Sequence, residues 1–188
     1  MGYRSLYAEW VVLVILARIN YQITSSLGDL KRFFKKDESM GMSKYLDPRL
    51  IVFLEETNRD GVIEKLVNTL DANGKLLDKN RFHQAILDRE QIVSTGIGIG
   101  VAIPHAKLEG YNDFFIAIGV QKKKGVDWNA LDGCVVKLIF MIGGPENKQT
   151  EYLKILSRLT QAVKDEDRRK KLVKTHSPNE VIELFQGC

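Results

Sequence analysis

The sequence predicts one α/β domain, because helical and strand patterns alternate along most of its length. From residue 43 onward, segments with apolar residues at three- and four-residue steps alternate with short, continuous apolar runs. Neither an internal repeat nor a low-complexity linker divides this part of the chain. The 188 residues suffice for one domain with a substantial core, plus about 40 residues of additional structure.

The first two helices are predicted from their capping residues. Asn58 or Asp60 caps a helix whose apolar residues recur at helical steps, and the Asn-Gly pair at 73–74 ends it. Asp78 caps a second helix, which ends near residues 89–90. Each helix has one apolar face, so we expect both to pack on a sheet.

Two strands are predicted in the middle of the chain. Residues 113–120 and 134–142 are apolar, β-rich runs typical of strands that are covered on both faces. The basic segment 122–125 between them is expected to be a solvated turn rather than a binding patch.

Three helices are predicted to follow these strands. Residues 148–163 carry a broad apolar stripe, and residues 165–174 form a short charged helix. In the last helix, Ser177 is the expected capping residue, Pro178 lies in the first turn, and Glu180 is the acid of a capping box.

The composition excludes several classes of protein. There are 28 basic and 24 acidic residues, a net charge of +4, and 44% of the residues are hydrophobic. This balance excludes a disordered polyelectrolyte and gives no reason to expect nucleic-acid binding. By their spacing, Cys134 and Cys188 form neither a disulfide framework nor a zinc site. A reducing, cytoplasmic compartment fits best.

Residues 1–42 are predicted to be an N-terminal extension of uncertain structure. Its uncharged run, residues 10–17, is too short for the roughly 20 residues that span a membrane, and it makes a poor secretion signal. Residues 30–36 interleave basic and aromatic side chains, so contact with an anionic membrane is a less favoured alternative. Met40 and Met42 stand just ahead of the domain, and the sequence leaves open whether the preceding residues are translated.

One of the three histidines has an unusual setting. His83 and His176 are expected to be ordinary exposed or capping residues, whereas His105 follows the apolar segment 101–104. Pro104 cannot donate to a sheet, so we expect the imidazole of His105 to emerge where a short strand ends. Sites of α/β proteins form at such strand ends.

A polar, glycine-containing segment precedes this histidine. Ser94 and Thr95 supply hydroxyl groups, and the backbone at Gly96 and Gly98 can approach an anion and donate N–H groups to it. We therefore expect these four residues to bind a phosphoryl group. The spacing matches neither the dinucleotide fingerprint nor a P-loop, and no metal or acyl-transfer motif is present, so no metal or cofactor is expected.

Together these residues resemble the signature of the fructose/mannitol/nitrogen-type (type 2) enzyme IIA domain of the bacterial phosphotransferase system. The signature residues are Glu90, the Ile-Gly pair at 97–98 and residues 101–106. The resemblance continues through residues 94–98, 125–133 and 153–159, and covers about residues 45–185. Residues 43–188 are accordingly assigned to one such domain.

The resemblance implies a fold and a function. The implied fold is a three-layer α/β/α arrangement, with a small mixed sheet flanked by helices on both faces. The residue matching His105 accepts a phosphoryl group from the phosphocarrier HPr, or from a nitrogen-type HPr, and passes it to a IIB cysteine or uses it to signal to protein targets. The family's arginine beside the phosphoryl group matches Arg89.

This chain departs from the family at Tyr152. Many members carry a second active-site histidine at this place. A phenol can donate a hydrogen bond but is neutral at about pH 7. We expect His105 to be phosphorylated still, with an altered stability of the phosphohistidine or an altered choice of partner. The alternative is that Tyr152 is only a helix residue at the rim of the core.

Three functions are compatible with these residues. The favoured one is a stand-alone regulatory IIA of the nitrogen type, and the second is the IIA component of a fructose- or mannitol-type sugar permease. The third is a non-catalytic protein-binding module that keeps the fold. The residues do not identify a sugar, a protein target or an oligomeric state.

Overall fold

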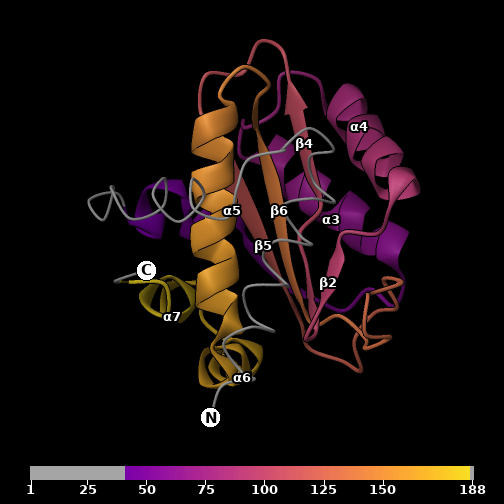
Figure 1. The fold of residues 1–188 in the computed structure, drawn as a ribbon, viewed down its shortest axis with the longest axis vertical. Coiled ribbons are helices and arrows are strands. Elements are labelled where there is room, and N and C mark those ends of the chain that lie inside the picture. The colour runs from indigo at the N-terminus through magenta and orange to yellow at the C-terminus, as the bar shows by residue number, and fades with distance from the viewer. Residues whose placement is uncertain (1–40, 187–188) are drawn as a thin grey trace, which may run out of the picture.

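The computed structural model describes residues 41–186, and in these the predicted three-layer α/β/α arrangement is confirmed (Figure 1). The predicted N-terminal extension lies outside the described residues, except for its last two. None of the helices in the described part of the chain has the length and apolar character needed to cross a bilayer.

A mixed sheet of six strands forms the middle layer. Its order is β1-β5-β6-β3-β2, and β4 also pairs with β6. β5 and β6 are antiparallel, whereas β1 is parallel to β5, and β3 and β4 are both parallel to β6. The strands are β1 (Ile51–Leu54), β2 (Gly96–Gly98), β3 (Val101–Ala102), β4 (His105–Leu108), β5 (Phe115–Gln121) and β6 (Leu138–Pro145).

The helices cover both faces of this sheet. α3 (Arg59–Ala72) and α4 (Lys79–Ile92) lie on one face, and α5 (Gln149–Lys164), α6 (Glu166–Lys174) and α7 (Pro178–Glu183) lie on the other (Figure 1). Two short 3-10 helices, Met42–Tyr45 and Pro48–Leu50, precede β1.

Side-chain alternation in the central strands produces two cores. In β5, Ile116 and Ile118 pack in the cluster with α5, whereas Phe115 and Ala117 pack in the cluster with α3 and α4. Every residue of β5 and β6 is buried, so the prediction of two strands covered on both faces is confirmed.

The local capping signals are used as the sequence predicts. The Asn58 side chain accepts a hydrogen bond from the amide of Gly61 at 2.8 Å, and the Asp78 side chain accepts one from the amide of Arg81 at 2.9 Å. Both bonds satisfy amides that have no partner inside the first helical turn.

Three details of the prediction were wrong. His105 begins strand β4 rather than ending a strand, because its backbone pairs in parallel with that of Ile142 in β6. The strand expected from residue 134 starts only at Leu138, since residues 131–135 are exposed. The last helix forms, but the side chain of Ser177 does not cap it, and Glu180 instead accepts a hydrogen bond from Thr175 Oγ1.

Candidate functional site

The imidazole of His105 lies on the α5 side of the sheet. It is the first residue of β4, and the next residue, Ala106, packs in the opposite core with α3 and α4. The ring centroid of His105 is 5.6 Å from that of Tyr152 on α5. Only 6% of His105 is exposed, so this residue is buried.

The hydrogen bonds of His105 fix its tautomer. Arg89 Nε donates to His105 Nε2 across 3.1 Å, and a guanidinium group has donors only. Nε2 must therefore be the acceptor, which leaves the ring proton on Nδ1. Nδ1 lies 2.9 Å from the carbonyl oxygen of Ile103 and donates to it. The nitrogen that keeps a lone pair is Nε2, the one facing Arg89.

Burial keeps this imidazole neutral. The pKa of His105 is lowered from 6.5 to about 4, chiefly by desolvation; the hydrogen bond to Ile103 opposes this change, and the nearby charges of Arg89 and Lys107 add to it. A neutral ring with a free nitrogen lone pair is a competent nucleophile throughout the physiological pH range.

Arg89 reaches this nitrogen from the other helical layer. It belongs to the last turn of α4, and its Nη1 donates to the carbonyl oxygen of Val93 at 2.8 Å. That second bond holds the guanidinium in place while Nε points at the imidazole. The structure thus brings together the two residues that the sequence predicts to be the phosphoryl acceptor and its stabilising cation.

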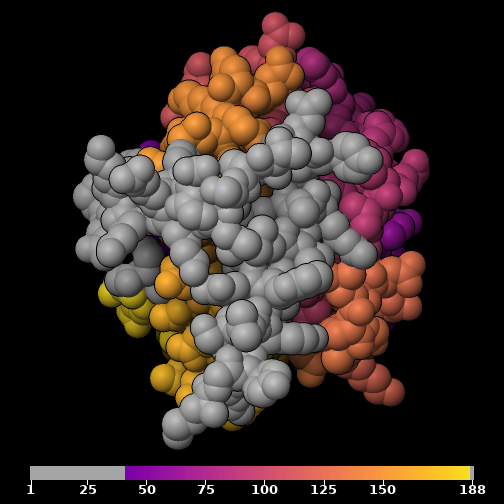
Figure 2. All heavy atoms as spheres, in the orientation of Figure 1, coloured from indigo at the N-terminus to yellow at the C-terminus, as the bar shows by residue number. Residues whose placement is uncertain are grey.

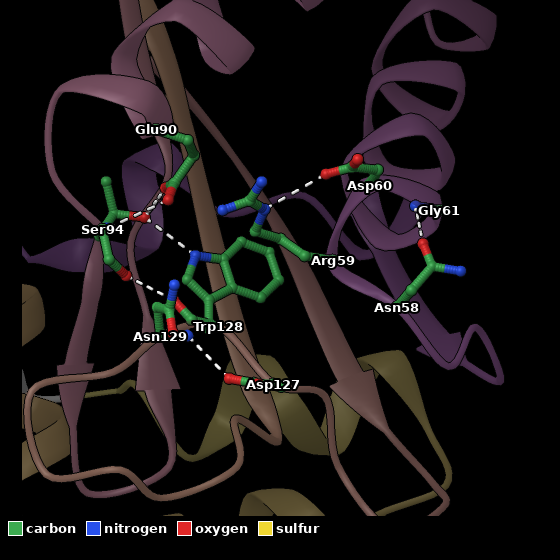
Figure 3. A network of polar contacts seen from close by, with 10 residues as sticks. Asn58, Arg59, Asp60, Gly61, Glu90, Ser94, Asp127, Trp128 and Asn129 are labelled. Atoms are coloured by element: carbon green, nitrogen blue, oxygen red, sulfur yellow. Dashed lines mark hydrogen bonds and ion pairs between the residues drawn. The ribbon is translucent and has the colours of Figure 1, made fainter.

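A buried polar network forms around Glu90, the residue that follows Arg89. The Glu90 carboxylate accepts hydrogen bonds from the Thr95 amide, at 3.2 Å, and from the Thr95 hydroxyl. Trp128 Nε1 donates to the same hydroxyl at 3.3 Å, and Ser94 Oγ donates to the Trp128 carbonyl oxygen at 2.5 Å. Figure 3 shows Glu90 and Ser94 gathered around the indole. The network links the end of α4 to the segment that leads to His105.

The predicted phosphate-binding segment is therefore engaged with protein groups. Ser94 and Thr95 use their hydrogen-bonding groups within the network. Gly96 packs against Ala130, where an added Cβ would lie only 2.9 Å from the Ala130 Cα. Gly98 has φ +87° and faces the carboxylate of Asp132. Close packing and a left-handed backbone thus explain both glycines, and contact of this segment with a phosphoryl group stays a prediction.

One hollow of about 360 Å³ lies beside this network. The residues that line it are Asn58, Arg59, Asp60, Asp127, Trp128 and Asn129. His105 is not among these lining residues. Residues 41–186 contain no group of three or more His, Cys, Asp or Glu side chains that could hold a metal ion.

Lys107 lies near the histidine and contacts Gln149, and neither residue is predicted from the sequence as a site residue. Lys107 Nζ donates to Gln149 Oε1 and lies 4.8 Å from the ring centroid of Tyr152. Lys107 follows His105 by two residues, which in a strand places both side chains on one face. The two-residue spacing of His105 and Lys107 could have pointed to Lys107 as a neighbour of the histidine, but only if His105 was known to begin a strand.

Comparison with known proteins identifies the family to which this fold belongs. Residues 44–188 match the family model described as "Phosphoenolpyruvate-dependent sugar phosphotransferase system, EIIA 2". The chain belongs to this family. It is a type-2 IIA domain, a phosphoryl-carrying component of the phosphotransferase system, as the sequence signature predicts.

Three relatives show the range of the family. The IIA domain is 40% identical over 132 residues to the PTS system fructose-specific EIIABC component of Bacillus subtilis, covering 70% of this chain but only about a fifth (21%) of that protein. It is 33% identical to the PTS system fructose-specific EIIA component of Haloferax volcanii, over 74% of this chain and 92% of that one. Nitrogen regulatory protein IIA-Ntr from Neisseria meningitidis superposes with a TM-score of 0.72 at 28% identity, covering 77% and 99% of the two chains.

Proposed function

We propose that this IIA domain carries the phosphoryl group on Nε2 of His105. The observation that carries the proposal is the contact between Arg89 Nε and His105 Nε2, because it selects the nucleophilic nitrogen and puts a cation beside it. Phosphoryl transfer depends mostly on positioning and on stabilising charge, so a guanidinium at this place supplies what the reaction requires of the protein.

The transfer step balances without a cofactor. The lone pair of His105 Nε2 attacks the phosphorus of a phosphohistidine on the donor, and the P–N bond of the donor breaks with its electron pair returning to the donor imidazole. The proton on His105 Nδ1 stays in its hydrogen bond to Ile103 throughout. Arg89 moves its hydrogen bond from the ring nitrogen to a phosphoryl oxygen, where it neutralises part of the charge.

The proposed partners are two proteins of the phosphotransferase system. HPr, or a nitrogen-type HPr, is the donor, and the acceptor is a IIB cysteine or a regulated protein. A distant structural neighbour was solved as a complex of enzyme IIAMTL with phosphorylated enzyme IIBMTL from Escherichia coli. We place the domain in the cytoplasm, where these partners work.

The two proposed subtypes have different support. Fructose-specific relatives at 40% and 33% identity favour a IIA component that passes phosphate to the IIB cysteine of a fructose-type permease. The superposition on a nitrogen regulatory protein, with its TM-score of 0.72, keeps the regulatory IIA as the second candidate. Transfer from the phosphorylated domain to a purified fructose-type IIB protein distinguishes them.

The first experiment is incubation of the full chain with phosphoenolpyruvate, enzyme I and HPr. We expect one acid-labile, histidine-linked phosphate on the wild-type protein and on His176→Ala, and none on His105→Ala. His176 is an exposed histidine in the same chain, so it is the matched control. No phosphate on any of the three proteins refutes the carrier and supports the non-catalytic binding module.

A further inference from the structure

The hydroxyl group of Tyr152 is buried beside the proposed nucleophile without a partner. Tyr152 is 1% exposed, and no acceptor among the described residues receives a hydrogen bond from its hydroxyl. Its ring stacks on Phe114, with centroids 6.1 Å apart, and also adjoins the His105 ring. Leaving a buried hydroxyl unpaired costs about 1–3 kcal/mol. A group that is absent from the resting protein and accepts this hydrogen bond would recover that free energy.

A second unpaired donor lies on the same helix. Gln149 Nε2 is buried and has no acceptor among residues 41–186. Gln149 is the first residue of α5 and precedes Tyr152 by three positions, so the two side chains share one face of the helix. Two unpaired donors on one helix face, one of them beside the proposed phosphoryl acceptor, point to an anion that binds there.

Lys107 adds a positive charge at the same place. Its Nζ lies over the Tyr152 ring and donates to Gln149 Oε1, so it joins the two unpaired residues. Burial lowers the pKa of Lys107, and the carboxylate of Glu146 opposes that change. The cation is therefore partly desolvated, and an added anion would be attracted to it more strongly than to a lysine in open solvent.

The start of α5 favours an anion as well. The N-cap residue, Lys148, makes no side-chain hydrogen bond to the first turn. The amino-terminal end of a helix carries a partial positive charge. In Figure 2 the orange atoms around residue 150, where α5 begins, lie at the upper end of the molecule. Burial raises the pKa of Tyr152, and the charge of Arg89 opposes this change. The Arg89 guanidinium is therefore near the phenol as well as the imidazole.

We propose that Lys107, Gln149 and Tyr152 form a second arm that binds the oxygens of a phosphoryl group carried by His105. This inference rests on the proposed function of His105 and adds three residues to its site. Arg89 binds the phosphoryl group from α4, while the second arm binds it from β4 and α5. Because the Tyr152 hydroxyl and the Gln149 amide gain acceptors only when His105 is phosphorylated, the arm stabilises the phosphorylated form relative to the free protein.

The equilibrium of transfer from HPr tests the arm directly. Lys107→Met should shift that equilibrium toward phosphorylated HPr about tenfold or more, since a hydrogen bond to a charged group contributes about 1.5–3 kcal/mol. Tyr152→Phe should shift it in the same direction, and Lys107→Arg should recover most of the loss. Lys65→Met, on the exposed face of α3, and Tyr111→Phe are the matched controls and should keep the wild-type equilibrium.

A second measurement separates the arm from the identity of the donor. Potassium phosphoramidate phosphorylates imidazole nitrogens and releases ammonia, so it loads His105 without any partner protein. The side-chain amide signal of Gln149 should move strongly on loading of the wild-type protein and stay in place in His105→Ala. If HPr fails as a donor but this signal moves, the proposed function is wrong and the arm stands. An unmoved signal together with wild-type equilibria in the Lys107 and Tyr152 variants refutes the arm alone.

Discussion

The neutral state of His105 predicts a specific dependence of stability on pH. The folded protein holds this imidazole at a pKa of about 4, whereas the unfolded chain titrates near 6.5. Between these values the unfolded state binds more protons than the folded state. The free energy of unfolding must therefore fall as the pH is lowered from about 6.5 toward 4.

The magnitude follows from the two pKa values. A fall from 6.5 to about 4 corresponds to about 3 kcal/mol when the pH lies below both values. Between pH 7.5 and pH 5 the loss from this one group is about 2 kcal/mol. Carboxylates also titrate toward the lower end of this range, so the wild-type curve alone does not isolate the histidine.

Replacing the histidine isolates its contribution. His105→Gln cannot titrate in this range, so its stability should decline less on acidification, by about 2 kcal/mol between pH 7.5 and pH 5. Urea denaturation of both proteins at half-unit pH steps measures the difference. His176→Gln changes an exposed histidine and should follow the wild-type curve. Parallel curves for the wild type and His105→Gln would show that the ring is not held neutral by burial.

Two further predictions concern the support of the site. Arg89→Ala should slow phosphoryl uptake from HPr about 10- to 100-fold, because it removes a charge-assisted hydrogen bond, and Arg89→Lys should recover part of the rate. Quench-flow kinetics measures these rates. An unchanged rate in the alanine variant contradicts the role of Arg89. Glu90→Ala should lower the free energy of unfolding by about 1–3 kcal/mol in urea titrations, since the buried amide of Thr95 loses its acceptor. The exposed Glu64→Ala is its control, and equal losses in the two variants would argue against the buried network.

The helices could be predicted because their signals are local. Asn58 and Asp78 lie within three residues of the amides that they cap, so a short stretch of sequence contains the whole interaction. The last helix shows the limit of this reasoning. The carboxylate of Glu180 could cap its own helix or bond to Thr175, and the sequence does not reveal which acceptor and donor meet.

The candidate site was only partly predictable, because it is assembled by long-range contacts. The sequence signature predicts His105 and the family resemblance predicts Arg89, but the pairing of His105 with Ile142 depends on where β6 runs. A reader of the sequence alone does not know that pairing and so cannot tell which side of the sheet Lys107 faces. The contact between Lys107 and Gln149 joins residues 42 positions apart, so it could not be inferred from spacing.

The roles of burial and of Arg89 at His105 can be separated. Desolvation is the largest cause of the lowered pKa of His105, and the charge of Arg89 is a smaller one. Removing the guanidinium would raise the pKa only in part, so the ring should stay neutral at pH 7 in Arg89→Ala. A loss of transfer in that variant would then report weaker binding of the phosphoryl group, and not protonation of the nucleophile. The hydrogen bond from Arg89 to Nε2 in the resting protein is thus best understood as a holding position, from which the same donor passes to a phosphoryl oxygen when the P–N bond forms.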